Sequence, residues 1–175
     1  TDFFITASLE SWPGNGQFMN PYIIQGYTIN ANGTGNCIYI GNTTDYFIIR
    51  NCELINSSGN ISPISYGAGI TLNSVQNGRI ENNNISGNRF GVYLFSSNNN
   101  IISNCTTYNS NYGIQINTLN NIITKCVVYN TNVSRSLRDS NNTINNCITH
   151  NNRDGLRSGN SFNNTLTNCK SYNNT

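Results

Sequence analysis

A motif of seven residues occurs four times in the second half of this chain, and it limits the possible folds more than any other feature. Each copy begins with two asparagines, has an apolar fourth residue and ends on a cysteine. The copies are residues 99–105, 120–126, 141–147 and 163–169. A recurrence every 21 or 22 residues indicates a solenoid, because each copy has too few apolar residues to bury alone and must stack on its neighbours.

The segments between these motifs alternate apolar residues with other residues. The clearest examples are Val92-Tyr93-Leu94, Ile114-Gln115-Ile116, Ile38-Tyr39-Ile40 and Ile70-Thr71-Leu72. Alternation with a period of two predicts short strands with one face in a core, and the helical period of 3.6 does not recur along the sequence. We therefore predict an all-β solenoid of parallel strands with coils of about 21–22 residues.

In such a solenoid, residues at equal repeat positions lie about 4.8 Å apart and form columns. One column holds the cysteines, with asparagine in one coil: Cys52, Asn83, Cys105, Cys126, Cys147 and Cys169. A second column holds Tyr108, Tyr129, His150 and Tyr172, and the next holds Asn109, Asn130, Asn151 and Asn173. We expect the asparagine column to hydrogen-bond along its length. We also expect Asn83 to satisfy backbone groups at a bend, and Asn88 to sit at a looser position.

The repeat divides the chain into two parts. Residues 1–25 do not follow the repeat and are rich in aromatic residues, which suits a segment that caps the first coil. Residues 26–175 are expected to form the coils. The spacing between Cys52 and Asn83 is 31 residues, so we expect an insertion at about residues 57–66, expelled to one face as a surface loop.

Composition narrows the choice of partners and location. Charged residues make up 9% of the chain and the net charge is +2, which gives no reason to expect nucleic acid or a membrane surface as a partner. The sequence has no apolar run long enough to span a bilayer. It starts at Thr1 without methionine, and we expect a secreted or cell-surface protein whose signal peptide was removed, with a chain trimmed from a longer one as the alternative. Possible glycosylation sites in Asn-x-Ser/Thr sequences include Asn32, Asn42, Asn60, Asn84 and Asn132.

The repeat resembles that of the right-handed parallel β-helix proteins. The resemblance rests on the asparagine-rich motif followed by strands such as Phe90-Gly91-Val92-Tyr93-Leu94, and it covers about residues 26–175. That superfamily includes NosD-type factors and archaeal surface proteins, and the segment Trp12-Pro13-Gly14-Asn15-Gly16 with Asn20-Pro21-Tyr22-Ile23-Ile24 is similar to the opening of the archaeal surface group. The resemblance implies a single-stranded right-handed β-helix, distantly similar to pectate lyases, with an inward asparagine ladder at the column of Asn83. It implies little about activity, because this fold has unrelated functions.

The sequence offers no set of catalytic residues. Polysaccharide-cleaving relatives need clustered acids, whereas the seven acids here do not align in one column on adjacent coils. We therefore expect no catalytic residue and no cofactor, and we lean against an enzyme. We also expect no metal site of the zinc type, since no cysteine or histidine spacing gives a tetrahedral set. Copper binding by the thiols stays open, although burial argues against it.

The cysteine column has two possible states. Side chains at equal positions on parallel strands point the same way, which holds their Cβ atoms slightly too far apart for an easy bridge. We favour buried thiols that act as small hydrophobes. A disulfide such as Cys105–Cys126 in an oxidising compartment is the alternative.

Each of two groups of charged residues has two possible interpretations. His150 is close in sequence to Arg153, Asp154 and Arg157, which could form a site, but a filler in the aromatic column is the simpler interpretation. Arg135 takes the repeat position of Ile114, and Asp154 lies on the next coil. The two could pair inside the coil, or a local register slip could turn Arg135 outward.

We expect a surface protein that self-assembles into a filament, sheath or layer through its coil ends. The alternative is a carbohydrate-binding module or a degenerate polysaccharide-processing β-helix. In either case the contact candidates are Tyr108, Tyr129, His150, Tyr172 and Arg157.

Overall fold

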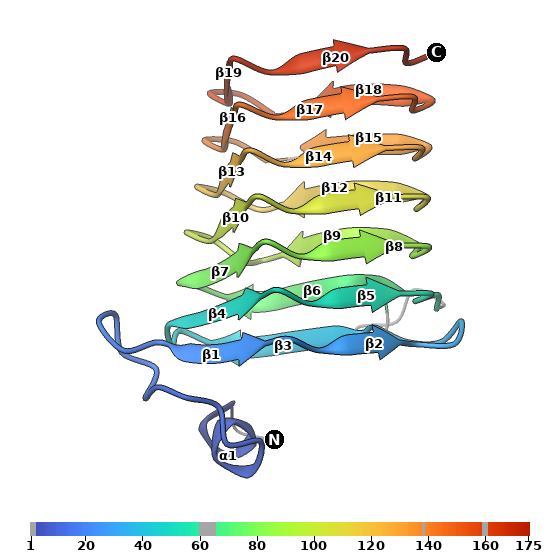
Figure 1. The fold of residues 1–175 in the computed structure, drawn as a ribbon. Helices are drawn as coiled ribbons and strands as arrows, with labels where there is room; N and C mark the ends of the chain where they lie inside the picture. The colour runs from blue at the N-terminus through green and yellow to red at the C-terminus, as the bar shows by residue number, and fades with distance from the viewer. Residues whose placement is uncertain (1–2, 60–65, 138, 159–160) are drawn as a thin grey trace.

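The structure, a computed structural model, describes residues 3–59, 66–137, 139–158 and 161–175. Within these ranges the chain winds into three sheets of seven, seven and six strands around a common axis (Figure 1). Each strand pairs in parallel with the strand one coil away, as β1 does with β4 and β9 with β12. The predicted all-β parallel solenoid is confirmed.

Along the chain the strands alternate between sheets I, II and III, and the last described coil adds strands to sheets I and II only. Sheet I consists of β1 (Tyr22–Gln25), β4 (Phe47–Arg50), β7 (Gly78–Glu81), β10 (Ile101–Ser103), β13 (Ile122–Thr124), β16 (Thr143–Asn145) and β19 (Thr165–Thr167). Sheet II consists of β2 (Thr28–Asn30), β5 (Glu53–Ile55), β8 (Asn84–Ser86), β11 (Thr106–Tyr108), β14 (Val127–Tyr129), β17 (Ile148–His150) and β20 (Lys170–Tyr172). Sheet III has the longest strands: β3 (Ile38–Thr43), β6 (Ala68–Val75), β9 (Phe90–Phe95), β12 (Tyr112–Asn117), β15 (Val133–Leu137) and β18 (Asp154–Ser158).

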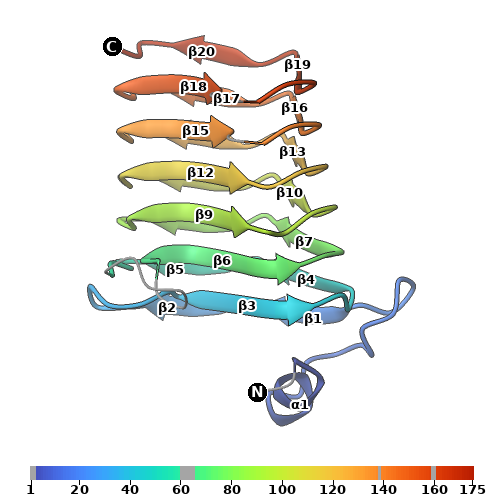
Figure 2. The ribbon, with the colours of Figure 1, turned by 180° about the vertical axis from the view of Figure 1, so that it is seen from behind.

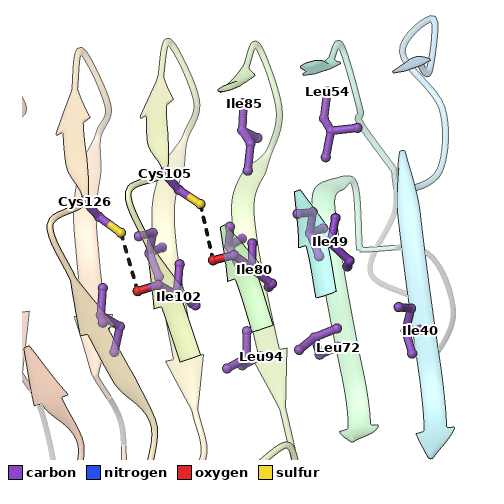
Figure 3. Packing of buried hydrophobic residues seen from close by; sticks show 14 of the residues in the cluster. Ile40, Ile49, Leu54, Leu72, Ile80, Ile85, Leu94, Ile102, Cys105 and Cys126 are labelled. Atoms are coloured by element: carbon purple, nitrogen blue, oxygen red, sulfur yellow. Dashed lines mark hydrogen bonds between the residues drawn. The ribbon is translucent and has the colours of Figure 1, made fainter. Parts of the chain in front are cut away.

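The core fills the space between the three sheets. Each coil adds a few apolar side chains that pack on the equivalent side chains of the next coil, and Figure 3 shows Leu72 beside Leu94 and Ile80 beside Ile102. These side chains are fully buried. Burial of one such side chain contributes roughly 1.5–3 kcal/mol, so stability grows with the number of stacked coils.

A short helix, α1 (Phe3–Leu9), covers part of the first coil. Its Phe3 ring lies 5.4 Å from the ring of Phe47 and 5.7 Å from that of Tyr22, measured between ring centroids. The sequence predicted a cap here but not a helix, because seven residues are too few to show helical periodicity. Strand β1 already begins at Tyr22, before the expected boundary at residue 26, and Tyr22 is buried in the core of the first coil.

Buried asparagines form the hydrogen-bonded columns at the corners of the coil. Asn100, Asn121 and Asn142 are fully buried, and the backbone N–H of each of Asn100 and Asn121 donates to the side-chain oxygen one coil ahead at 2.9 Å. Corners need such partners because backbone groups there leave the sheet ladders. The expected column at Asn109, Asn130 and Asn151 has another role. These residues are exposed and adopt left-handed turns with φ of 50–54°.

Asn88 is not at a looser position, and that expectation was wrong. Its side chain is 3% exposed. The amide oxygen accepts a hydrogen bond from the backbone of Ser57 at 2.7 Å, and the amide nitrogen donates to the carbonyl of Leu54 at 3.1 Å. Asn83 makes the same kind of contacts with Cys52 and Ile49, at 2.9 and 3.0 Å. The two asparagines therefore serve two successive bends of one coil.

The insertion expected at 57–66 lies mostly outside the described residues, which omit 60–65. Its described ends are anchored rather than loose, since Ser57 is fully buried and Tyr66 is 8% exposed. The register slip proposed for Arg135 is wrong, because its backbone pairs with Ile114 on one side and Leu156 on the other. The placement of the Arg135 side chain is outside the described part of the structure.

Candidate functional site

A groove with a volume of about 870 Å³ runs along the solenoid where the chain enters sheet III. Four of its lining residues take the same turn position on successive coils, directly before β9, β12, β15 and β18: Arg89, Asn111, Asn132 and Arg153. Backbone hydrogen bonds connect these turns, for example from Tyr112 N to Arg89 O at 2.9 Å. The polar side chains of the groove are therefore spaced by single coil steps of about 4.8 Å.

The N-terminal end of the groove is lined by the turn after β2 and by the described start of the insertion, on the two coils before that of Arg89. It includes Gly33, Gly35, Ser58 and Gly59. Arg89 connects to this end of the groove, because its Nη1 donates to the carbonyl of Gly59 at 3.0 Å. Its guanidinium carbon also lies 5.4 Å from the centre of the Phe90 ring, within cation–π range. This cation is thus held in place by neutral groups.

Six aromatic side chains lie beside the groove on the outer face of sheet III, which faces the viewer in Figure 2. We call this surface the aromatic face: Tyr39, Tyr66, Phe90, Tyr93, Phe95 and Tyr112. Phe90 stacks on both Tyr93 and Tyr112 with ring centroids 4.9 Å apart. Because Tyr112 also lines the groove, the groove and the aromatic face form one continuous surface.

The rings of the aromatic face differ in their exposure to solvent. Phe90 and Tyr93 are each 7% exposed, whereas Tyr39 is 37% and Phe95 is 41% exposed. The amides of Asn73 and Asn117 donate to the hydroxyls of Tyr39 and Tyr93 at 3.1 and 3.2 Å, which orients both phenols. The Tyr93 ring also lies 6.4 Å from the Phe95 ring and supports it, and the rings of Tyr39 and Phe95 remain open to a partner.

The aromatic column predicted from the sequence lies on sheet II and is separate from the aromatic face of sheet III. Tyr108, Tyr129, His150 and Tyr172 form a continuous stack with centroid separations of 5.0, 5.1 and 5.2 Å and interplanar angles of 3–7°. Each ring covers the face of the next, so Tyr129 and His150 present only their edges to solvent. The stack stabilises the coils laterally, but its inner rings have no free face for a sugar.

The cysteine column is a row of buried hydrogen-bond donors. All six cysteines fall in described ranges and carry thiols in the structure. The thiols of Cys105 and Cys126 donate to the carbonyls of Ile80 and Ile102 in the previous coil, at 3.6 and 3.7 Å (Figure 3). The contact with Cys105, together with burial, raises the pKa of Cys126 to about 12. A thiol with so high a pKa is a poor nucleophile at neutral pH.

We expect the four thiols of the C-terminal part of this column to be reduced in the folded protein: Cys105, Cys126, Cys147 and Cys169. A thiol reagent added in denaturant should therefore detect at least these four groups, while in the native protein the three buried thiols, all but Cys169, should react slowly. A count of two or fewer thiols in denaturant would contradict this expectation and favour the disulfide alternative.

The described residues contain no group of three or more His, Cys, Asp or Glu side chains that could hold a metal ion. Among the same residues, no helix is long and apolar enough to cross a membrane.

Comparison with known proteins agrees with this architecture. The sequence matches the family described as the right-handed β-helix region over residues 14–170. The chain belongs to the right-handed β-helix family. The match covers both the groove and the aromatic face of the β-helix, and it confirms the handedness and the resemblance inferred from the repeat.

One solved structure shares this fold at low sequence identity. It is a crystal structure of a candidate glycosyl hydrolase from Parabacteroides merdae, with a TM-score of 0.58 at 14% sequence identity. The alignment covers 96% of this β-helix and 86% of that chain. A likeness at this identity shows the fold alone. No match was found among curated proteins.

The structure separates the residues that the sequence grouped as a contact site. Arg157 lies on β18 in sheet III and lines the groove, where its guanidinium is 3.8 Å from the Asp154 carboxylate. His150 lies in the sheet II stack, between Tyr129 and Tyr172. The proposed cluster of histidine, aspartate and arginine therefore divides between two sheets.

The possible glycosylation sites are mostly accessible. Asn32, Asn42, Asn84 and Asn132 are exposed, and Asn132 lines the groove. Asn60 lies outside the described residues. Their modification stays a prediction.

Sequence reasoning missed the groove residues Arg89 and Asn111 and the aromatic face, and it grouped Arg153 with His150 instead of with the groove. A signal for both was present. The residue two positions before Gly91, Gly113 and Gly155 is always Arg or Asn. The central residue of the apolar-x-apolar strands is tyrosine at Tyr39 and Tyr93, and it points away from the core in a strand.

Proposed function

We propose that this β-helix binds a glycan on the outer side of sheet III, across the groove and the aromatic face. The observation that carries the proposal is the continuity of the two surfaces through Tyr112. A groove of about 870 Å³ is in the size range of ligand sites. Amide and guanidinium groups supply hydrogen bonds to hydroxyls, and the exposed rings of Tyr39 and Phe95 offer flat apolar surfaces to the C–H faces of sugars.

The chemistry of the groove favours binding over cleavage. Glycoside hydrolysis by the common mechanisms uses two carboxylates on either side of the scissile bond. Asp154 is the single carboxylate among the described residues that line the groove. The Parabacteroides merdae protein supports a carbohydrate ligand through its description as a candidate glycosyl hydrolase. A secreted or surface location fits this role and forms part of the proposal.

Binding to a glycan array tests the proposal. Phe95→Ala and Tyr39→Ala should each weaken the strongest signal about tenfold, since removing one aromatic ring from a binding site costs about 1–1.5 kcal/mol. Tyr172→Ala is the matched control. Tyr172 is 48% exposed but belongs to the sheet II stack, so its replacement should leave binding unchanged.

An array without signals, or equal losses in Phe95→Ala and Tyr172→Ala, would overturn glycan binding on sheet III. Circular dichroism and denaturant midpoints of all three variants would confirm that any loss of signal arises in a folded protein.

Self-association is a second proposal, favoured by apolar exposure near the last coil. Leu166 on β19 is 45% exposed and Tyr172 on β20 is 48% exposed, and exposed apolar side chains on neighbouring strands favour contact with another copy. Light scattering should detect concentration-dependent species that Leu166→Lys reduces. A monomer at high concentration would contradict it.

A further inference from the structure

The groove holds more positive charge than hydrogen bonding to neutral sugars requires. Arg89, Arg153 and Arg157 line it, and Asp154 is the one carboxylate among its described lining residues. The groove thus has an excess of two positive charges, the same as the net charge of the entire chain. In a concave surface of low dielectric, charges of one sign raise the local concentration of an oppositely charged ligand.

Two of the three arginines lack a carboxylate partner within the described structure. Asp154 lies 3.8 Å from Arg157 and partly neutralises it. The described ion pairs include neither Arg89 nor Arg153. Within the described structure the guanidinium of Arg89 makes one hydrogen bond, to the carbonyl of Gly59, and a guanidinium has five N–H donors. Both cations therefore retain donors for an anion.

Arg89 and Arg153 occupy the same turn position three coil steps apart, which corresponds to about 14 Å along the axis. Asn111 and Asn132 fill the two coils between them. Between Arg89 and Arg153 the groove is therefore a strip with a cation at each end and amides in the middle. Such a strip matches an extended chain that carries separated anionic groups and has hydroxyls between them.

We infer that the glycan bound in the groove is anionic, with carboxylate or sulfate substituents contacting Arg89 and Arg153. This inference rests on the proposed glycan binding and adds its chemical class. The planar guanidinium fork binds both kinds of oxygen pair through two parallel hydrogen bonds. The fixed backbone spacing of the coils sets the distance between the anionic groups.

The test uses the intact protein on an array of neutral, uronate-containing and sulfated oligosaccharides, together with polyglutamate. Anionic glycans should bind at least tenfold more tightly than neutral glycans and than polyglutamate. The double variant Arg89→Gln/Arg153→Gln should lose at least tenfold for anionic glycans. It should also lose most of the salt dependence of binding, which is strong when charges interact across solvent. Uronate-only or sulfate-only binding would support the inference and identify the substituent.

The control is Arg50→Gln/Lys170→Gln, which removes the same charge from strands β4 and β20, away from the groove. This control should bind like the parent chain. Equal losses in the two double variants would show that net charge matters and would overturn the inference. Signals restricted to neutral glycans would overturn it while leaving glycan binding intact, whereas a chain that binds only polyglutamate would overturn both proposals.

Discussion

Gly113→Val is expected to lower the free energy of unfolding by about 3 kcal/mol, because it overpacks a site with no space for a side chain. A Cβ atom at Gly113 would lie 2.3 Å from Cγ1 of Val128 and 2.4 Å from the carbonyl oxygen of Ser134. The second contact is with backbone of the next coil, which cannot move without disturbing the sheet ladder. The urea midpoint should fall while the slope of the transition stays unchanged.

The matched control is Gly155→Val, in the same repeat position two coils further on. There the nearest atoms to a Cβ are the ends of the Ser171 and Asn174 side chains, at 2.7 and 3.1 Å, and these can rotate away. We expect less than half the loss seen at Gly113. Equal midpoints for the two variants would contradict the steric explanation.

Asn83→Leu and Asn88→Leu are each expected to cost about 2–3 kcal/mol. Each substitution leaves one buried backbone N–H and one buried carbonyl without a partner, and an unsatisfied buried group costs roughly 1–3 kcal/mol. Chemical denaturation of the two variants measures the loss. The two effects should be similar, because the asparagines hold successive bends of one coil.

Asn132→Leu serves as the control for this pair. Asn132 is exposed, so its replacement should change stability by no more than about 0.5 kcal/mol. A large effect at Asn83 with a negligible effect at Asn88 would restore the sequence-based view of Asn88 as a loose position and contradict the hydrogen bonds described above.

Most of the fold could be predicted from the chain because a solenoid repeats a local pattern. The interval of 21 or 22 residues between cysteine motifs implies stacked coils, and stacking in register makes columns of equal positions unavoidable. The structure accordingly places Cys105 and Cys126 in one column, and Tyr108 on Tyr129. Departures from the repeat were harder to interpret. Helix α1 and the anchored Ser57 are held by contacts with residues distant in sequence.

The sequence alone determined which residues share a column, but only the tertiary structure decided what each column does. Asn88 and Asn109 look alike in the sequence, yet one is buried with two backbone partners and the other is an exposed left-handed turn residue. The same holds for aromatic rings, which cover one another on sheet II and lie open at Tyr39 and Phe95 on sheet III. Period and composition set the spacing along the axis, whereas the bends between sheets set the direction of each side chain. The candidate site depends on those directions. Arg89, Tyr112 and Arg157 belong to three different coils and line one groove only because these coils stack.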